Sequence, residues 1–142
     1  MRIFLDANIL FSGARPESRT RAFLQILFDN FDCLTNAYAV EEARRNVEIK
    51  DPRQVSELIS LVDRCTMVAS LVVELSVKLE PKDIPILGGA IAGKATHLLT
   101  GDARHFGLYF GKIIDGVKVV SPKILAHELS SHGNISIGPA KA

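Results

Sequence analysis

Two apolar stretches of the chain end in an aspartate, and both have the composition of buried β-strands. Residues 2–5 read Arg-Ile-Phe-Leu and lead into Asp6, and residues 97–101 read His-Leu-Leu-Thr-Gly and lead into Asp102. A carboxylate at the end of a hydrophobic strand is costly unless another group compensates its charge. The two aspartates are therefore the first candidates for a functional site.

Further acidic side chains begin predicted helices. Asp83 precedes the apolar segment 84–93, and Glu41 and Glu42 lie about one turn into a helix that starts near residue 37. In open α/β sheets, sites form outside the carboxyl ends of the strands, at the point where the strand order reverses. If the two strands that end in aspartate are neighbours there, all of these acids face one crevice.

Several carboxylates in one crevice repel each other, and their pKa values would rise if nothing neutralised them. Mg²⁺ and Mn²⁺ remove that penalty, because hard divalent cations prefer carboxylate oxygens as ligands. Such an ion polarises a phosphoryl oxygen and lowers the pKa of a bound water molecule. No serine or cysteine stands out as a nucleophile paired with a histidine. The pattern therefore favours metal-assisted hydrolysis with water as the nucleophile.

The elements that must position these acids follow a βα alternation. Five short apolar segments have the length and composition of strands: residues 2–6, 32–35, 66–68, 97–100 and 117–120. Helical spacing and capping residues predict helices at residues 18–28, from about 37, from about 52, at 84–93 and at 122–129. Residues 71–79 alternate as a strand does, yet Glu74 and Lys78 also suit a helix, so both alternatives stay open. The alternation predicts a parallel sheet covered on both faces, a three-layer α/β/α fold.

Length and composition fit a single domain, residues 1–130, followed by a loose tail over residues 131–142. The chain has 142 residues, of which 47% are hydrophobic and 23% charged, and its net charge is +1. This balance excludes a strongly basic nucleic-acid coat but permits a local basic groove. We expect no membrane association, because the chain has neither a signal peptide nor an apolar stretch of spanning length. Two separated cysteines without CxxC spacing fit a cytoplasmic protein.

Three stretches resemble the PIN-domain family, the PilT N-terminus-like nucleases that include the VapC toxins. They are LDANIL at residues 5–10, EEARRNV at 41–47 and PKDIPILGGAIAGKATHLLTGDARHFG at 81–107. The resemblance implies a parallel sheet in the order 3-2-1-4-5, which places the first and fourth strands side by side. It also implies a Mg²⁺- or Mn²⁺-dependent endoribonuclease, the toxin of a toxin–antitoxin pair. RNA would be its substrate, an antitoxin protein its partner, and a homodimer its assembly.

Residue by residue, the resemblance implies a metal site of four acids with two supporting polar side chains. The acids that match the family's metal-binding and catalytic positions are Asp6, Glu41 or Glu42, Asp83 and Asp102. Glu42 is favoured over Glu41, because the family's acid usually precedes a small or apolar residue, as Glu42 precedes Ala43. Asn8 and Thr100 match small polar positions and are expected to orient the ligands.

The chain departs from the family pattern at two places. Many relatives carry another acid two residues after the last aspartate, where this chain has Arg104. Gly88 and Gly89 stand where alanines are usual, and each costs roughly 0.5–1 kcal/mol relative to alanine inside a helix. Either a neighbouring backbone approaches closely there, or this helix is soft.

Other interpretations of the same residues stay open at this stage. Taken alone, Asp83 is most simply a helix N-cap and Asp102 a turn residue. His105 suits a hydrogen bond within a loop better than the role of general base. A phosphatase of the haloacid-dehalogenase type is a poor match, because it needs an aspartate where the chain has Asn8. The remaining rival is a catalytically weak PIN-fold module that binds RNA or protein. Five arginines suit a phosphate-binding rim and plain solvated charge equally well: Arg15, Arg19, Arg21, Arg44 and Arg45.

Overall fold

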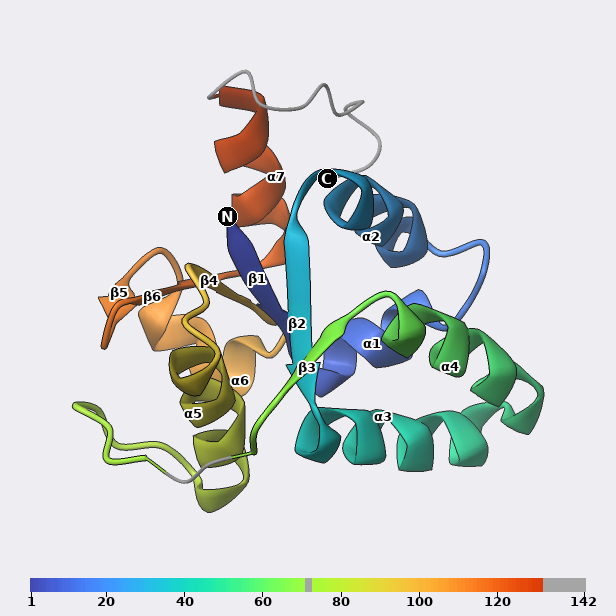
Figure 1. Cartoon of the computed structure of the whole chain (residues 1–142), viewed down its shortest axis with the longest axis horizontal. Helices are drawn as coiled ribbons and strands as arrows, with labels where there is room; N and C mark the ends of the chain where they lie inside the picture. Colours follow the sequence, from blue (N-terminus) through green and yellow to red (C-terminus); the bar gives the residue numbers. More distant parts are fainter. Residues whose placement is uncertain (71–72, 132–142) are drawn as a thin grey trace.

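The computed structural model describes residues 1–70 and 73–131, which form a six-stranded sheet with helices on both faces (Figure 1). The strands lie in the order β3-β2-β1-β4-β6-β5, and every neighbouring pair is parallel except β5 and β6. Their bounds are β1 (Arg2–Leu5), β2 (Asp32–Asn36), β3 (Thr66–Val68), β4 (His97–Leu99), β5 (Ile113–Ile114) and β6 (Val117–Val120).

The predicted three-layer α/β fold is confirmed, and the five predicted strands lie in the predicted order. β3, β2, β1, β4 and β6 follow the sequence 3-2-1-4-5 across the sheet. The sixth strand, β5, is an addition that the sequence analysis misses. It has two residues and pairs with β6 across a turn in which Asp115 and Gly116 have φ values of 50° and 88°. A strand this short carries no periodic signal of its own.

Seven α-helices and three single 3₁₀ turns lie within the described residues. The helices are α1 (Ala7–Gly13), α2 (Arg19–Asn30), α3 (Ala37–Lys50), α4 (Val55–Asp63), α5 (Ile84–Ala92), α6 (Ala103–Phe106) and α7 (Pro122–Ser131). The 3₁₀ turns are η1 (Pro52–Gln54), η2 (Pro81–Asp83) and η3 (Gly107–Tyr109). The predicted caps of two helices are present, because Ser18 accepts from the Arg21 N–H and Ser121 from the Ile124 N–H. The short helices α1 and α6 are not predicted by the sequence analysis.

The two faces of the sheet carry different helices. Phe4 points toward α5, because a Cβ added at Gly89 would lie 3.0 Å from its ring. Side chains alternate along a strand, so Ile3 and its register neighbour His97 point to the opposite face. There His97 contacts Glu128 of α7. The central strands are therefore covered from both sides, which explains why β1 and β4 read as nearly continuous apolar runs.

The carboxyl ends of β1, β2 and β4 form the edge where the predicted acids gather. The helices α1 and α3 begin at this edge, directly after β1 and β2. Residues 73–79, from the segment left open between strand and helix, adopt neither. Residues 71–72 and most of the predicted tail, 132–142, lie outside the described residues. Within those residues, no helix combines the length and the apolar composition that crossing a membrane requires.

Candidate metal centre

Asp6 follows β1 at the carboxyl edge of the sheet and caps α1. Its backbone N–H donates to the carbonyl oxygen of Leu99 on β4 at 3.1 Å. Its Oδ1 accepts the Ala7 N–H at 2.6 Å, and its Oδ2 accepts the Thr100 hydroxyl at 2.8 Å and the Asn8 amide at 3.1 Å. Asp6 is only 4% exposed. The carboxylate is thus buried and held in one orientation by three donors.

Burial raises the pKa of Asp6 from 3.8 to about 6. Hydrogen bonds from Thr100 and Ala7 lower this pKa, while the negative charges of Glu42 and Asp83 raise it further. Burial dominates because a charged carboxylate loses more solvation than these hydrogen bonds replace. The three acids therefore act on one another electrostatically, and a cation placed among them would stabilise the charged form of Asp6.

Thr100 and Asn8 connect Asp6 to the loop that carries Asp102. The Thr100 hydroxyl, which donates to Asp6, also accepts the Asp102 N–H at 3.1 Å. The Asn8 amide donates to Asp6 and to the Thr100 hydroxyl oxygen at 3.3 Å, and the Asn8 carbonyl oxygen accepts the Gly101 N–H at 2.8 Å. These contacts fix the position of Asp6 relative to the backbone of Asp102.

Asp83, Asp102 and His105 lie together beside this network. His105 Nδ1 lies 2.6 Å from Asp83 Oδ2 and 3.8 Å from Asp102 Oδ2. The His105 backbone N–H donates to Asp102 Oδ1 at 3.0 Å, so this oxygen caps α6. One ligand atom from each of the three residues lies within 4.8 Å of the other two. This separation is compatible with three ligands of one ion.

Asp83 does not cap the helix that it precedes, contrary to the simplest interpretation of the sequence. It ends the η2 turn, and its side chain makes no capping hydrogen bond to α5. Asp83 is only 6% exposed, and its carboxylate contacts His105, which is 22 residues further along the chain. The carboxylate thus points toward α6 and is available to the cluster.

Glu41 and Glu42 lie on different sides of α3. Glu41 is exposed and forms a bidentate ion pair with Arg44, which holds the pKa of Glu41 below its usual range. Glu42 is half-buried, and its charge contributes to the raised pKa values of both Asp6 and Tyr38. The geometry therefore favours Glu42 as the acid that faces the site, although it lies outside the close group of Asp83, Asp102 and His105.

The three aspartates have little positive charge to compensate them. Within residues 1–70 and 73–131, neither lysine nor arginine forms an ion pair with Asp6, Asp83 or Asp102, and the imidazole of His105 is the basic group in contact. Carboxylates that are buried together require a counter-charge. The donor set of carboxylates and one imidazole fits a divalent cation.

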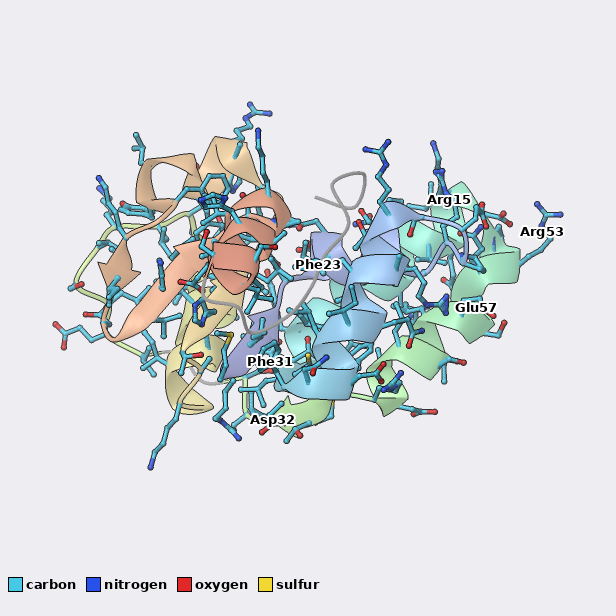
Figure 2. All side chains as sticks on the ribbon, turned by 90° about the horizontal axis from the view of Figure 1, so that it is seen from above. Arg15, Phe23, Phe31, Asp32, Arg53 and Glu57 are labelled. Carbon is cyan, nitrogen blue, oxygen red and sulfur yellow. The ribbon has the colours of Figure 1, made fainter. Side chains whose placement is uncertain are left out.

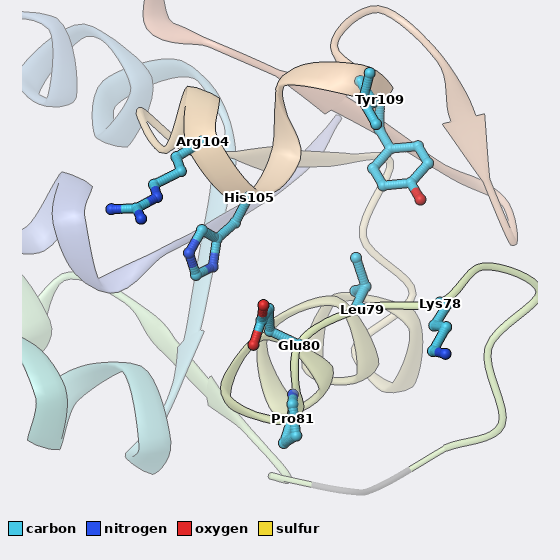
Figure 3. A pocket seen from close by; sticks show the side chains of 8 residues that line it. Lys78, Leu79, Glu80, Pro81, Arg104, His105 and Tyr109 are labelled. Atoms are coloured by element: carbon cyan, nitrogen blue, oxygen red, sulfur yellow. The ribbon is translucent and has the colours of Figure 1, made fainter.

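A surface cavity of about 530 Å³ opens next to this group (Figure 3). The His105 side chain extends from α6 toward the segment that carries Glu80 and Pro81. The other lining residues combine basic, apolar and aromatic side chains: Lys78, Leu79, Arg104, Leu108 and Tyr109. Leu108 is 81% exposed, so the rim of the cavity is partly apolar. His105 belongs to the lining and the four candidate acids do not, so the cavity meets the site at the imidazole.

The arginines considered as a phosphate-binding rim separate into two groups. Arg21 pairs with Glu57, and Arg44 pairs with Glu41 and Glu48, so these two are occupied within the protein. Arg15 is exposed and extends outward from the loop before α2 (Figure 2). Arg15 and Arg19 line a second cavity of about 660 Å³, distinct in its residues from the one beside His105. Of these four arginines, Arg15 and Arg19 line this cavity and Arg21 and Arg44 do not.

His105 is the residue of this site that the sequence analysis undervalues. The sequence predicts a hydrogen bond of His105 within a loop, whereas its imidazole contacts Asp83 on the η2 turn, 22 residues earlier in the chain. One signal was available. Asp102 and His105 are three residues apart, which places both on one side of a single helical turn.

Comparison with protein-family models finds no match, and comparison with curated protein sequences finds none either. Solved structures do show similar folds. One is VapBC2 from Rickettsia felis bound to a DNA fragment from their promoter, with a TM-score of 0.62 and 16% identity over 85% of this chain and 98% of that one. Another is FitAcB from Neisseria gonorrhoeae, with a TM-score of 0.54 and 19% identity over the same shares of the two chains. At these identities the likeness shows a shared fold.

Proposed function

We propose that the protein is a metal-dependent endoribonuclease. The observation that carries the proposal is the set of aspartates at the carboxyl edge of the sheet, buried or half-buried and without a lysine or arginine partner among the described residues. The set comprises Asp6, Asp83 and Asp102, with Glu42 on the neighbouring helix. Buried acids that repel one another electrostatically and lack a counter-charge are typical of functional sites.

Each residue of the proposed site has a physical role. Asp83 and Asp102 hold Mg²⁺ or Mn²⁺, and Asp6 and Glu42 add negative charge that strengthens cation binding. Thr100 and Asn8 orient Asp6 through the hydrogen bonds described above. When bound, the ion supplies Lewis-acid chemistry, which polarises a phosphodiester and lowers the pKa of a water molecule.

The cavity beside His105 is the proposed approach of the RNA strand. Arg104 and Lys78 line it and supply positive charge for phosphate groups, and Tyr109 offers an aromatic ring to a base. Glu80 also lines the cavity, so its charge is mixed, and two basic side chains there are compatible with a net charge of +1 for the whole chain. Arg104 stands where many relatives of the resembled family carry an acid, so in this proposal it serves substrate binding.

We also infer that the protein is the toxin of a toxin–antitoxin pair. Two lines support this inference: the motifs resemble a family that includes the VapC toxins, and one similar fold is VapBC2 bound to promoter DNA. An antitoxin partner, a homodimer and a cytoplasmic location follow from the same resemblance and belong to this inference.

RNA cleavage by the purified protein tests the proposal. A mixture of structured and single-stranded RNAs is incubated with wild type, Asp83→Asn and Asp102→Asn, in Mn²⁺ and in EDTA. Loss of one ligand removes several kcal/mol of charge stabilisation, so each variant should cleave at least about 100-fold more slowly than wild type. Asp32→Asn, at the other end of the sheet, is the matched control and should keep its activity.

Equal cleavage by wild type and both site variants would mean that a contaminating nuclease is responsible, and the proposal would fail. Binding of RNA without cleavage in Mn²⁺ would favour the rival interpretation, a PIN-fold module that binds RNA without turnover. In that case the acids would serve metal binding alone.

A further inference from the structure

We propose that His105 is a direct metal ligand, together with Asp83 and Asp102, and that its nitrogen makes the centre select transition-metal ions over Mg²⁺. The proposal rests on the metal-dependent function inferred above but concerns the composition of the centre. The resemblance implies a centre of acids and two small polar residues. The structure instead places an imidazole between two of those acids.

The distances fit a shared ion. Ligands that bind a metal at about 2.1 Å in octahedral geometry lie about 3 Å apart when adjacent and about 4 Å apart when opposite. The Nδ1 of His105 lies 2.6 Å from Asp83 Oδ2 and 3.8 Å from Asp102 Oδ2. Both distances from His105 are within a few tenths of an ångström of these separations, and the three ligand atoms all lie within 4.8 Å of one another.

Within the described residues, the required atoms of Asp83 and His105 hydrogen-bond to each other and to no third group, so a bound ion would replace this one hydrogen bond. Asp102 uses Oδ1 to accept the His105 N–H, which leaves Oδ2 as its free oxygen toward the imidazole. The same hydrogen bond fixes the start of α6 and so fixes where the imidazole emerges. The side chains of Asp83 and His105 are 9% and 16% exposed, so a small solvent-accessible opening remains for an ion.

The nitrogen ligand determines the selectivity. Mg²⁺ strongly prefers oxygen ligands, whereas imidazole suits the later first-row transition metals. A centre of two carboxylates and one imidazole should therefore prefer Co²⁺ to Mg²⁺. The margin of this preference, the ratio of the Mg²⁺ Kd to the Co²⁺ Kd, should be larger than for a centre of carboxylates alone. A residue that only held Asp83 in place by a hydrogen bond would leave this margin unchanged.

Metal binding by the full chain tests the proposal without any assay of activity. Co²⁺ and Mg²⁺ are titrated calorimetrically into wild type, His105→Ala and His105→Asn. The asparagine variant keeps a hydrogen-bond donor for Asp83 but lacks the imidazole. The ratio of the Mg²⁺ Kd to the Co²⁺ Kd should fall at least about 10-fold in both variants, the size of change that alterations around a metal ligand produce. His127→Asn, an exposed histidine on α7, is the control.

Electron spin-echo modulation of bound Mn²⁺ reports a directly coordinated ¹⁴N nucleus. The nitrogen signal should be present in wild type and in His127→Asn, and absent in both His105 variants. An unchanged Kd ratio in His105→Asn, or wild-type Mn²⁺ without the nitrogen signal, would overturn the proposal while leaving the ribonuclease function intact. A wild type that binds neither metal would overturn the proposed function as well.

Discussion

The two ends of the parallel sheet differ in how their ionisable side chains are paired. At the amino end, Arg2 pairs with Asp32, and Glu128 accepts from Lys118 at 2.7 Å and contacts His97 at 2.8 Å. At the carboxyl end, Asp6, Asp83 and Asp102 gather without a lysine or arginine partner among the described residues. Both ends hold several ionisable side chains, but among the described residues only those at the amino end are paired with lysine or arginine.

This difference separates charges that serve the fold from charges that serve a ligand. Paired groups such as Glu128 hold α7 onto β4 and β6, and removing one partner leaves the other uncompensated. The carboxyl-end acids make the fold less stable when no cation is bound, because burial raises the pKa of Asp6 and like charges raise it further. Substitutions at the two ends should therefore have opposite effects on stability.

The largest loss of stability is expected for Glu128→Ala. The variant leaves the buried His97 and the Lys118 ammonium without their acceptor, which costs about 2–3 kcal/mol. For a chain of this length the Tm should fall by about 8–12 °C, as measured by calorimetry. Glu128→Gln, which keeps an acceptor oxygen, should lose less. A Tm of Glu128→Ala within 2 °C of wild type would show that the amino-end pairs do not stabilise the fold.

Asp6→Asn should show the opposite sign, and its effect should depend on pH. Burial raises the pKa of Asp6 to about 6 in the folded protein, whereas the unfolded chain ionises near 3.8. The folded state therefore holds this proton longer, so wild type loses stability as the pH rises from about 4 to 6.5. The Asp6→Asn variant has no carboxyl group at this position, so it does not lose stability in this way as the pH rises.

In EDTA, the Tm of Asp6→Asn should rise relative to the Tm of wild type as the pH increases from about 4 to 6.5. The change corresponds to about 3 kcal/mol, and the difference should be constant above pH 7. A large drop in the Tm of the variant at pH 7.5 would show instead that Asp6 stabilises the fold.

Gly89→Ala should lower the Tm by a smaller amount, through packing rather than charge. A Cβ at Gly89 would overlap the Asn36 amide and lie 3.0 Å from the Phe4 ring. Asn36 caps α3 by accepting the Ala39 N–H and also donates to Pro85, so it cannot move freely. The expected cost is about 1–2 kcal/mol.

Gly107→Ala is the control, because a Cβ there would meet Ala103 at an ordinary 3.8 Å. If Gly89→Ala were as stable as this control, α5 would be soft, which is the other alternative that the two consecutive glycines raise.

The smallest effects separate Glu41 from Glu42. Glu42→Gln should weaken Mn²⁺ binding by about 10-fold, because it removes one of the negative charges that act on Asp6. Glu41→Gln should leave both the Mn²⁺ affinity and the Tm close to wild type, since its exposed pair with Arg44 contributes little. Titration calorimetry measures both. Equal loss of affinity in the two variants would contradict the assignment of Glu42.

The central fold follows from the sequence because its signals are local and repeated. Apolar runs of strand length alternate with helical periodicity, and this alternation predicts a parallel sheet, while the family resemblance implies the strand order from β3 to β6. The elements that the sequence analysis misses are α1, α6 and β5, which have seven, four and two residues. Segments this short depend on tertiary contacts for their stability. The Asp6 carboxylate, for example, caps α1 while Thr100 holds it from β4.

The candidate site is only partly predictable for the same reason. Strand ends and the parallel order suffice to bring Asp6 and Asp102 to one edge. The orientation of Asp83 is not predictable from local rules, which favour an N-cap, because a contact with a residue 22 positions away decides it. The role of His105 is not predictable because a histidine in a short polar segment has many ordinary roles, and only the tertiary structure shows which acids it contacts.

The most direct test of the account is the effect of Mn²⁺ on thermal stability at both ends of the sheet. Calorimetry compares wild type, the double variant Asp83→Asn with Asp102→Asn, and the amino-end control Asp32→Asn, each in EDTA and in Mn²⁺. At 100 times the Kd, Mn²⁺ should stabilise wild type and Asp32→Asn by about 2.7 kcal/mol, a rise in Tm of about 10 °C. The double variant should show no rise. Equal rises in all three proteins, or none in wild type, would contradict the claim that these acids hold a cation.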